Sequence, residues 1–419
     1  MTLPHCVGID LGSTTTKAVV LAEDGSVLGR GITNSRSNYA IACQVALSEA
    51  LIAARFGLLA REMDEGTLAA FALLFRGAQY RGQLRILGRI LLRIADRSGL
   101  EGTVEAILGE MDGEAPALFA AGASRKSDFF RDLAGSRYLA LAEDRAREQG
   151  LPFDRLAGLF DKAILEAENV PAGEESFAAH AQEALDALSG AGTTVSEAVR
   201  RAASVRLEQV GSVGTGYGRQ TLPFPREQIR SEILCHGLGA HAMFPGTRTV
   251  LDIGGQDTKA IQVDGDGIVT SFQMNDRCAA GCGRYLGYIA DEMNLGLHQL
   301  GPMACASTRP VRINSTCTVF AGAELRERLS LGEKREDILA GLHRAIVLRA
   351  MSLLARSGGI ADEFTFTGGV ARNPAAVAAL AGLVEENYGR LTTNISPDSI
   401  YTGALGAALF AHREWRARA

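Results

Sequence analysis

Residues 252–274 read DIGGQDTKAIQVDGDGIVTSFQM, and residues 10–32 read DLGSTTTKAVVLAEDGSVLGRGI. Both copies have Asp-x-Gly, a lysine at the same offset, an apolar run, an acidic-Gly turn and a further apolar run. A β-rich run also precedes each aspartate. This pattern predicts, twice, a strand, a tight glycine loop, a second strand, a turn at Asp24-Gly25 or Asp266-Gly267, and a third strand.

The glycines and small hydroxyl residues of these loops suit phosphate binding. They allow backbone N–H groups to approach phosphate oxygens closely, and an aspartate at a strand end holds Mg²⁺ through water. Two ordinary β-hairpins are the alternative, but the matched spacing favours hairpins that clamp one nucleotide. The residues expected to bind it are Gly12, Ser13, Thr14, Thr15, Thr16 and Lys17 in the first loop and Gly254, Gly255, Gln256 and Asp257 in the second, with Asp10 and Asp252 at the metal.

Two later segments extend the pattern. EFTFTGGVARN, from Glu363, predicts a strand, a Gly368-Gly369 turn that lies flat under an adenine ring, and a helix that starts near Asn373. After it, the glycines and alanines between 403 and 408 predict a small-faced helix packed closely on a neighbour. Gly368, Gly369 and Asn373 complete the expected nucleotide-binding set.

Composition limits the other classes. The chain has 419 residues, 47% hydrophobic content and a net charge of −5, which predicts a multidomain globular protein without a general basic field for nucleic acid or anionic membranes. The N-terminus runs directly into a strand, so we expect the cytoplasm. In that reducing compartment four close cysteines indicate metal or redox chemistry rather than disulfides: Cys278, Cys282, Cys305 and Cys317.

The order of these motifs resembles the actin, sugar kinase and Hsp70-type ATPase superfamily. Within it, NDRCAAGCGRYL, NSTCTVFAGAE and TGGVARN resemble the ATPases that activate electrons for benzoyl-CoA reductase and 2-hydroxyacyl-CoA dehydratase. The resemblance implies an α/β fold: two RNase H-like (actin-like ATPase) domains around a nucleotide cleft, with a mainly helical insertion. The implied parts are residues 1–44 with 206–247 (first domain), 45–205 (insertion), 248–402 (second domain, with the iron-sulfur cysteines) and 403–419 (C-terminal helix packing on the first domain).

The same resemblance implies a 4Fe-4S cluster shared between two ATPase subunits, with Cys278 and Cys317 as this chain's ligands. Each cysteine precedes an apolar helical pattern, and a helix N-terminus offers N–H groups and partial positive charge to an anionic cluster. Two alternatives stay open. In the first, the thiols are core residues. In the second, Cys282 and Cys305 join Cys278 and Cys317 as ligands of a cluster held within one chain. Cys6, Cys43 and Cys235 are expected to be small core residues.

We expect the site to catalyse ATP hydrolysis by positioning Mg²⁺, the phosphates and the attacking water. Asp10 and Asp252 orient Mg²⁺ and its waters, and Lys17 neutralises phosphate charge. Glu232 lies where relatives place the residue that aligns the attacking water. The alternative is that it is simply an acidic residue in the first turn of a helix. His236 and His241 are expected to be structural, and Lys259 a strand-edge charge.

The stretch from about residue 45 to 205 reads mostly as helix. Leu84, Leu87, Leu91 and Ile94 share one face, and arginines recur every four residues from Arg81 to Arg97 along another. A solvated basic face is the default interpretation and a docking surface for an acidic partner the alternative. An insertion of this size resembles the large ATPase subunit of ATP-dependent benzoyl-CoA reductase.

The resemblance therefore implies an ATPase that takes an electron from ferredoxin onto its shared cluster, hydrolyses ATP and passes the electron to acyl-CoA-binding reductase subunits. The expected partners are a second, homologous ATPase subunit, those reductase subunits and ferredoxin, without nucleic acid or membrane. The alternatives are the activator of a 2-hydroxyacyl-CoA dehydratase, a small-molecule kinase of the same superfamily, and a nucleotide-sensing scaffold.

Overall fold

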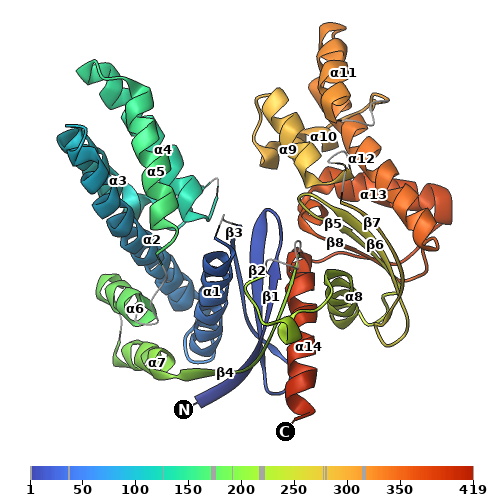
Figure 1. Ribbon diagram of the computed structural model, residues 1–419, viewed down its shortest axis with the longest axis horizontal. Coiled ribbons are helices and arrows are strands. Elements are labelled where there is room, and N and C mark those ends of the chain that lie inside the picture. The colour runs from blue at the N-terminus through green and yellow to red at the C-terminus, as the bar shows by residue number, and fades with distance from the viewer. Residues whose placement is uncertain are drawn as a thin grey trace. The chain divides into compact units, whose positions relative to one another are not determined.

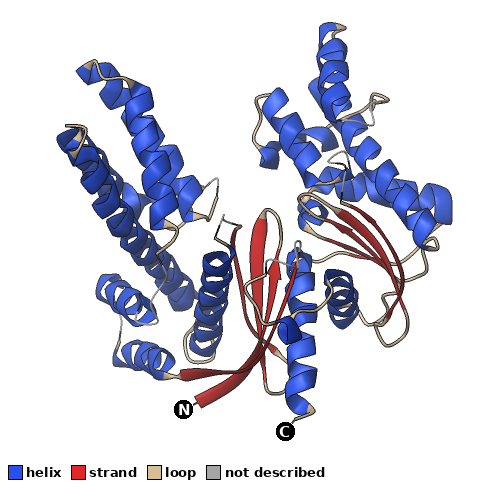
Figure 2. Cartoon of the chain, in the orientation of Figure 1, coloured by secondary structure: helices blue, strands red, loops and turns tan. Residues whose placement is uncertain are grey.

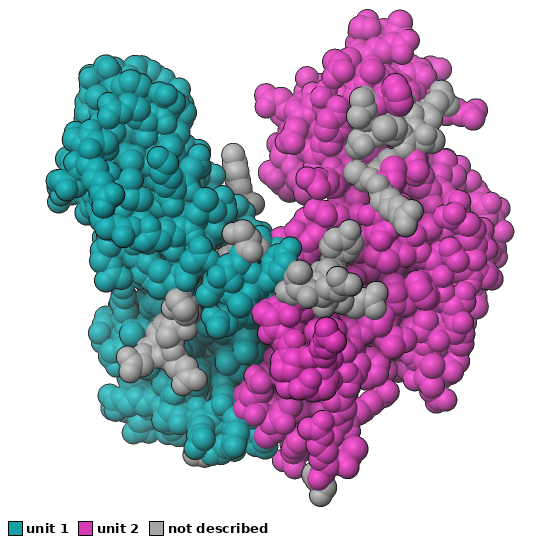
Figure 3. Space-filling view, viewed as in Figure 1, with its two compact units in different colours: residues 1–4, 28–208 teal, residues 5–27, 209–419 magenta. Residues whose placement is uncertain are grey.

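Figure 1 shows the computed structural model of the chain. The structure describes residues 2–35, 38–125, 127–170, 176–190, 192–216, 222–276, 278, 281–313 and 318–418. It separates into two compact units, coloured in Figure 3: unit 1 comprises residues 1–4 and 28–208, and unit 2 comprises residues 5–27 and 209–419. This division follows contacts within the chain, so the domain limits taken from the family pattern stay a prediction.

Unit 1 is mainly helical, which confirms the helical structure predicted for residues 45–205 (Figure 2). Leu84, Leu87 and Leu91 are buried, as their helical spacing predicts, against a core of leucines and aromatic rings. The helices of this unit are α1 (Tyr39–Leu59), α2 (Glu65–Asp96), α3 (Glu101–Leu118), α4 (Phe130–Gln149), α5 (Phe153–Ala167), α6 (Ser176–Ala187) and α7 (Thr193–Ser204), after strand β3 (Val27–Asn34).

Much of the arginine stripe of α2 pairs inside unit 1. Arg81 lies 2.6 Å from Glu183 of α6, and Arg93 lies 2.5 Å from Glu166 of α5. Arg85 is more exposed and reaches Glu183 at only 3.7 Å. These ion pairs join α2 to α6 and α5. The arginine stripe is therefore not a free basic face along its whole length.

In unit 2 the first predicted hairpin is formed by β1 (Thr2–Leu11) and β2 (Thr15–Ala22), next to β4 (Arg206–Gly216) in the order β2-β1-β4. Antiparallel pairing places Asp10 opposite Lys17. Helix α14 (Thr402–Arg416) packs on this sheet at backbone distance. A Cβ on Gly8 would lie 2.1 Å from the Ala404 carbonyl oxygen, so only glycine permits this approach.

The second sheet has the order β7-β6-β5-β8-β9 and repeats the hairpin. Its strands are β5 (Thr249–Ile253), β6 (Thr258–Val263), β7 (Val269–Asn275), β8 (Phe364–Thr367) and β9 (Thr393–Asn394). Asp252 lies opposite Lys259, as Asp10 lies opposite Lys17. The β5–β6 and β6–β7 pairs are antiparallel and the β5–β8 and β8–β9 pairs parallel, so the sheet is mixed.

Both faces of the second sheet are covered. Val250 belongs to a cluster with α8 (Glu232–Met243), whereas its neighbour Leu251 belongs to the large core beneath the following helices, as alternation along a strand requires. Those helices are α9 (Gly283–Glu292), α10 (Leu297–Cys305), α11 (Thr318–Ser330), α12 (Arg335–Ser357) and α13 (Pro374–Tyr388). Short 3₁₀ turns lie at Arg226–Gln228, Gly369–Arg372 and Pro397–Tyr401.

Two helices, α1 and α12, are long and apolar enough to cross a membrane by length and composition. Helix α12 contributes Ile346, Val347 and Leu354 to the large core of unit 2. Helix α1 packs on β3, where a Cβ on Gly31 would lie 2.1 Å from the Ala46 carbonyl oxygen. Both helices are therefore explained as core helices of a globular fold.

Candidate nucleotide site and adjoining cysteines

Asp10 and Asp252 lie near the ends of the first strands of the two hairpins, and both side chains are buried. Asp10 Oδ2 lies 3.7 Å from Lys17 Nζ, while Asp10 Oδ1 has no hydrogen-bond partner among the described residues. A buried carboxylate oxygen without a donor is costly unless a ligand, ion or water meets it. Asp10 is thus suited to a cation or its water shell.

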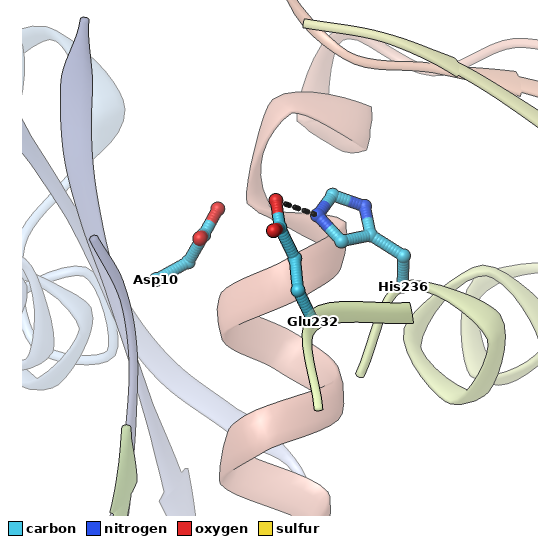
Figure 4. Close-up of side chains that lie close together, drawn as sticks. All are labelled: Asp10, Glu232 and His236. Atoms are coloured by element: carbon cyan, nitrogen blue, oxygen red, sulfur yellow. Dashed lines mark ion pairs between the residues drawn. The ribbon is translucent and has the colours of Figure 1, made fainter. Parts of the chain in front are cut away.

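Helix α8 brings two more side chains to Asp10. Glu232 and His236 lie one helical turn apart on the same face, and Figure 4 shows both beside Asp10. Ligand atoms of the three residues lie within 4.8 Å of one another. Burial raises the pKa of Glu232 above its ordinary value, against the opposing effect of Lys259.

His236 faces Asp252 on its other side, with Nδ1 3.4 Å from Asp252 Oδ1. Burial works against the charged imidazole, but the Asp252 carboxylate outweighs it and raises the pKa of His236 above its usual value. Carboxylate oxygens are the ligands that Mg²⁺ prefers, so within this group Asp10 and Glu232 are the better candidates to face such an ion.

Lys259 lies at the centre of the buried charges. Its Nζ is 2.8 Å from Asp257, 3.0 Å from Glu232 and 3.4 Å from Asp252. Burial alone would lower the pKa of the Lys259 ammonium, but the three carboxylates raise it well above the usual value. Burial likewise opposes ionisation of Asp252, yet His236 and Lys259 lower the pKa of its carboxyl group.

The two glycine loops meet within unit 2. A Cβ on Gly255 would lie 2.6 Å from the Thr14 side chain. Gly403, at the start of α14, packs over the carboxylate group, since a Cβ there would lie 2.8 Å from His236 Nε2 and 3.0 Å from Asp10 Oδ2. Glycine at both positions keeps space that any side chain would fill.

The predicted adenosine loop adjoins Asp252. Thr367 Oγ1 donates to Asp252 Oδ1 at 2.8 Å, and Gly368 has a φ of 87°, in the region that favours glycine. Asn373 caps α13, accepting hydrogen bonds from Ala375 N and Ala376 N, with proline at the first helical position. Its Nδ2 lies 3.0 Å from His343 Nε2.

The segment that carries Cys278 is hydrogen-bonded to the second loop. Gly283 N donates to the Gly254 carbonyl at 2.8 Å, and Arg284 N donates to the Gly255 carbonyl at 2.7 Å. Thr258 Oγ1 also donates to the Gly281 carbonyl. The first N–H groups of α9 therefore donate to the second glycine loop, which corrects the expectation that they are free for a cluster.

The environment of Cys278 is cationic. Its half-buried Sγ lies 3.8 Å from Arg349 Nη2, and Asn275 Nδ2 donates to its carbonyl at 2.9 Å. Cys282 is the buried N-cap of α9, where burial raises its thiol pKa, and Cys305 is exposed at the end of α10. Cys317 lies outside the described residues. Among the described residues, the Cys278 sulfur thus has the Arg349 guanidinium as a cationic neighbour.

Unit 2 brings together Asp10, Asp252 and Glu232 and places both glycine loops and the Gly368-Gly369 turn around them. Two residues were missed. His236 and Lys259, expected to be structural and a strand-edge charge, lie in the centre of the site. The sequence held a signal for Lys259, because it repeats the position of Lys17. The thiols expected in the core are buried: Cys6, Cys43 and Cys235.

A model of the BadF/BadG/BcrA/BcrD ATPase family matches residues 7–411. The chain belongs to this family. It is 41% identical over 226 residues to the (R)-2-hydroxyglutaryl-CoA dehydratase activating ATPase of Acidaminococcus fermentans, covering 54% of this chain and 84% of that protein. It is 30% identical over 208 residues to one of the subunits of benzoyl-CoA reductase from Thauera aromatica, covering 50% of this chain and 73% of that protein.

A solved structure agrees with the fold. The activator of 2-hydroxyisocaproyl-CoA dehydratase from Clostridium difficile, with bound ADPNP, has a TM-score of 0.54 at 23% identity, over 99% of this chain and 96% of that one. The predicted actin-like ATPase fold is thereby confirmed. The protein is an ATPase of the actin-like superfamily, and relatives named for CoA-dependent dehydratases and reductases are components of multi-subunit systems.

Proposed function

We propose that this ATPase is an electron activator. It hydrolyses ATP to drive an electron, taken from a ferredoxin, through a 4Fe-4S cluster shared with a second ATPase subunit to a partner enzyme that acts on a CoA thioester. One observation carries the proposal: backbone hydrogen bonds join Gly254 and Gly255 of the second loop directly to the helix that follows Cys278. Movement of the loop on nucleotide hydrolysis then displaces the cysteine segment.

The residues present fit the nucleotide and its metal. Asp10 has an unpartnered buried oxygen, and Glu232 presents a second carboxylate beside it. Bound Mg²⁺ would supply charge stabilisation to the phosphates. We assign Asp10 and Asp252 to orienting the ion's waters, Lys17 to the phosphates and Glu232 to positioning the attacking water. A related activator with bound ADPNP supports this nucleotide assignment.

The described part of the cluster site also fits. Cys278 has a cationic neighbour and a half-buried sulfur, which suits a ligand at a subunit surface. A bound 4Fe-4S cluster would supply one-electron chemistry. We assign Cys278 and Cys317 as this chain's ligands, with Cys282, buried at a helix cap, and Cys305 outside the ligand set.

Two partner enzymes fit. The large helical unit favours a benzoyl-CoA reductase-type complex, in which the electron reduces an aromatic acyl-CoA. Identity of 41% to a dehydratase activating ATPase, against 30% to a reductase component, favours a 2-hydroxyacyl-CoA dehydratase as the second candidate. Adding purified reductase or dehydratase component to the reduced ATPase with ATP separates them, because only the true partner turns over its thioester.

The test of the common function is anaerobic purification with iron analysis and an absorption spectrum. We expect brown protein whose iron is lost in Cys278→Ser and Cys317→Ser but kept in Cys282→Ser and Cys305→Ser, with ATP binding intact in all four. Iron loss in either control variant would favour a cluster within one chain. Colourless wild-type protein that phosphorylates a small molecule would contradict the proposal in favour of a kinase, and ATP binding with negligible hydrolysis in favour of a scaffold.

A further inference from the structure

Lys259 is the most deeply buried charge of the site, with 1% of its surface exposed. Its ammonium meets carboxylates from three elements: Glu232 from α8, Asp252 from β5, and Asp257 from the loop between β5 and β6. An ammonium has three N–H donors, and here three carboxylates surround it. This number of partners is more than a strand-edge charge requires.

The other copy of the repeat gives an internal comparison. Lys17 lies at the equivalent register, opposite Asp10, but its side chain is more exposed and its Nζ lies 3.7 Å from Asp10. Ligand atoms of Asp10, Glu232 and His236 lie within 4.8 Å of one another, and Lys259 joins this group through an ion pair with Glu232 at 3.0 Å. The two lysines therefore occupy one sequence position in different roles.

Among the described residues, the Glu232 carboxylate has its shortest ion pair with Lys259, at 3.0 Å. Besides Lys259, the cationic group beside it among the described residues is His236, whose Nε2 lies 3.9 Å away, which is too long for a hydrogen bond. A long side chain in the first turn of a helix has several rotamers, and a water-positioning carboxylate has to keep one of them. The Lys259 contact supplies this restraint.

We propose that Lys259 is a positioning residue for ATP hydrolysis: its ammonium holds the Glu232 carboxylate in the orientation that aligns the attacking water. This inference rests on the proposed role of Glu232. It acts without contact between Lys259 and the nucleotide. Removing the lysine should therefore slow the chemical step while leaving nucleotide affinity largely unchanged.

The test is steady-state ATP hydrolysis by Lys259→Met, Glu232→Gln and the double variant. Loss of a positioned general base costs about 10²-fold or more in kcat, so we expect a loss of that size for Lys259→Met with KM for ATP within about threefold. In the Glu232→Gln background, Lys259→Met should change kcat by less than about threefold, since residues that act as a unit are not additive. Lys17→Met, at the matched position, should instead act mainly on KM.

Several outcomes would overturn the inference: a further tenfold loss in the double variant relative to Glu232→Gln, a rise in KM without loss of kcat, or unchanged kcat in Glu232→Gln. If Lys259→Met does not fold, the double variant can still be compared with Glu232→Gln. It has lost one buried negative charge along with the positive one, so its fold is less disturbed. Failure of the electron-activator proposal is separate, since it appears as missing iron or missing electron delivery while these hydrolysis rates are unaffected.

Discussion

At the scale of single residues, the site depends on positions where a side chain is absent. Gly403 leaves the space above Asp10 and His236 open, and Gly368 places its backbone against the end of β5. These glycines have no side chain that contacts the site. Their contribution becomes measurable when a substitution adds a Cβ that overlaps neighbouring atoms.

We expect Gly403→Ala to lower ATP hydrolysis at least tenfold, because the new Cβ would lie 2.8 Å from His236 Nε2 and displace the carboxylate group. Overpacking of this kind also costs about 1–3 kcal/mol of stability. Gly382→Ala is the matched control: it lies in α13, where a Cβ meets nothing within 4 Å. Equal activity of the two variants would show that the space at Gly403 is not needed.

His343 gives a pH-dependent prediction. Burial lowers the pKa of this imidazole, whose Nδ1 lies 2.7 Å from the Leu339 carbonyl. The pKa of His343 is lower in the folded protein than in the unfolded chain, so folding favours the neutral imidazole. This contribution to stability is fully present above the unfolded pKa of about 6.5 and is lost as the pH falls through the folded pKa. We expect the free energy of unfolding, measured in urea, to fall between about pH 7 and pH 5, and His343→Gln to reduce that slope. An equal slope in His343→Gln and in the wild type would show that this imidazole does not contribute to the pH dependence.

At the scale of elements, the repeated hairpin and its register were predictable from the sequence. The spacing of Asp and Lys, with the turns at Gly25 and Gly267, dictates which residues face each other across two strands. The role of α8 was not predictable in the same way. His236 reaches Asp252 because α8 packs on the second sheet, where a Cβ on Gly237 would lie 2.7 Å from the Val269 side chain. Helix contacts of this kind are not encoded in a local pattern.

The link between β6 and the cysteine segment provides the third prediction. Thr258→Val removes the hydroxyl that donates to the Gly281 carbonyl and leaves a buried acceptor without its partner, at a cost of about 1–3 kcal/mol. We expect ATP hydrolysis within about threefold of wild type but several-fold fewer electrons delivered per ATP. Thr270→Val, at an exposed position of β7, should keep the ratio. An unchanged ratio in Thr258→Val would mean that this bond does not couple the two sites.

At the scale of the whole molecule, the chain divides its residues between a unit that carries the paired hairpins and a mainly helical unit with its own cores. The helical character of the second was predictable from its periodicity, but the ion pairs of its arginines were not, because Glu183 and Glu166 are far from α2 in sequence. Within this stripe Arg81 and Arg93 pair at 2.6 and 2.5 Å, whereas Arg85 reaches Glu183 only at 3.7 Å and Arg89 is exposed.

From the exposed Arg85 and Arg89 we predict that the helical unit contributes to binding of a partner subunit. Reversal of Arg85 and Arg89 to glutamate should leave ATP hydrolysis intact and weaken association with the acyl-CoA-binding partner, more so as salt is raised. Reversal of Arg147, which pairs within its own helix at 3.1 Å to Glu143, is the control. Size-exclusion chromatography of the mixed components checks this. Normal assembly of the double variant at moderate salt would return the stripe to a solvated face.

The bonds from Gly254 and Gly255 to α9 also decide where the loop's own donors point. A trans peptide unit carries its C=O and the following N–H on opposite sides. Because both carbonyls are directed at α9, the N–H groups of Gly255 and Gln256 are directed away from that helix. Folding has thus already fixed two amide dipoles before any anion arrives. Under the proposed function, the peptide planes that preorganise this loop for a phosphate would be the same ones that carry its displacement to α9, so a change in one would change the other.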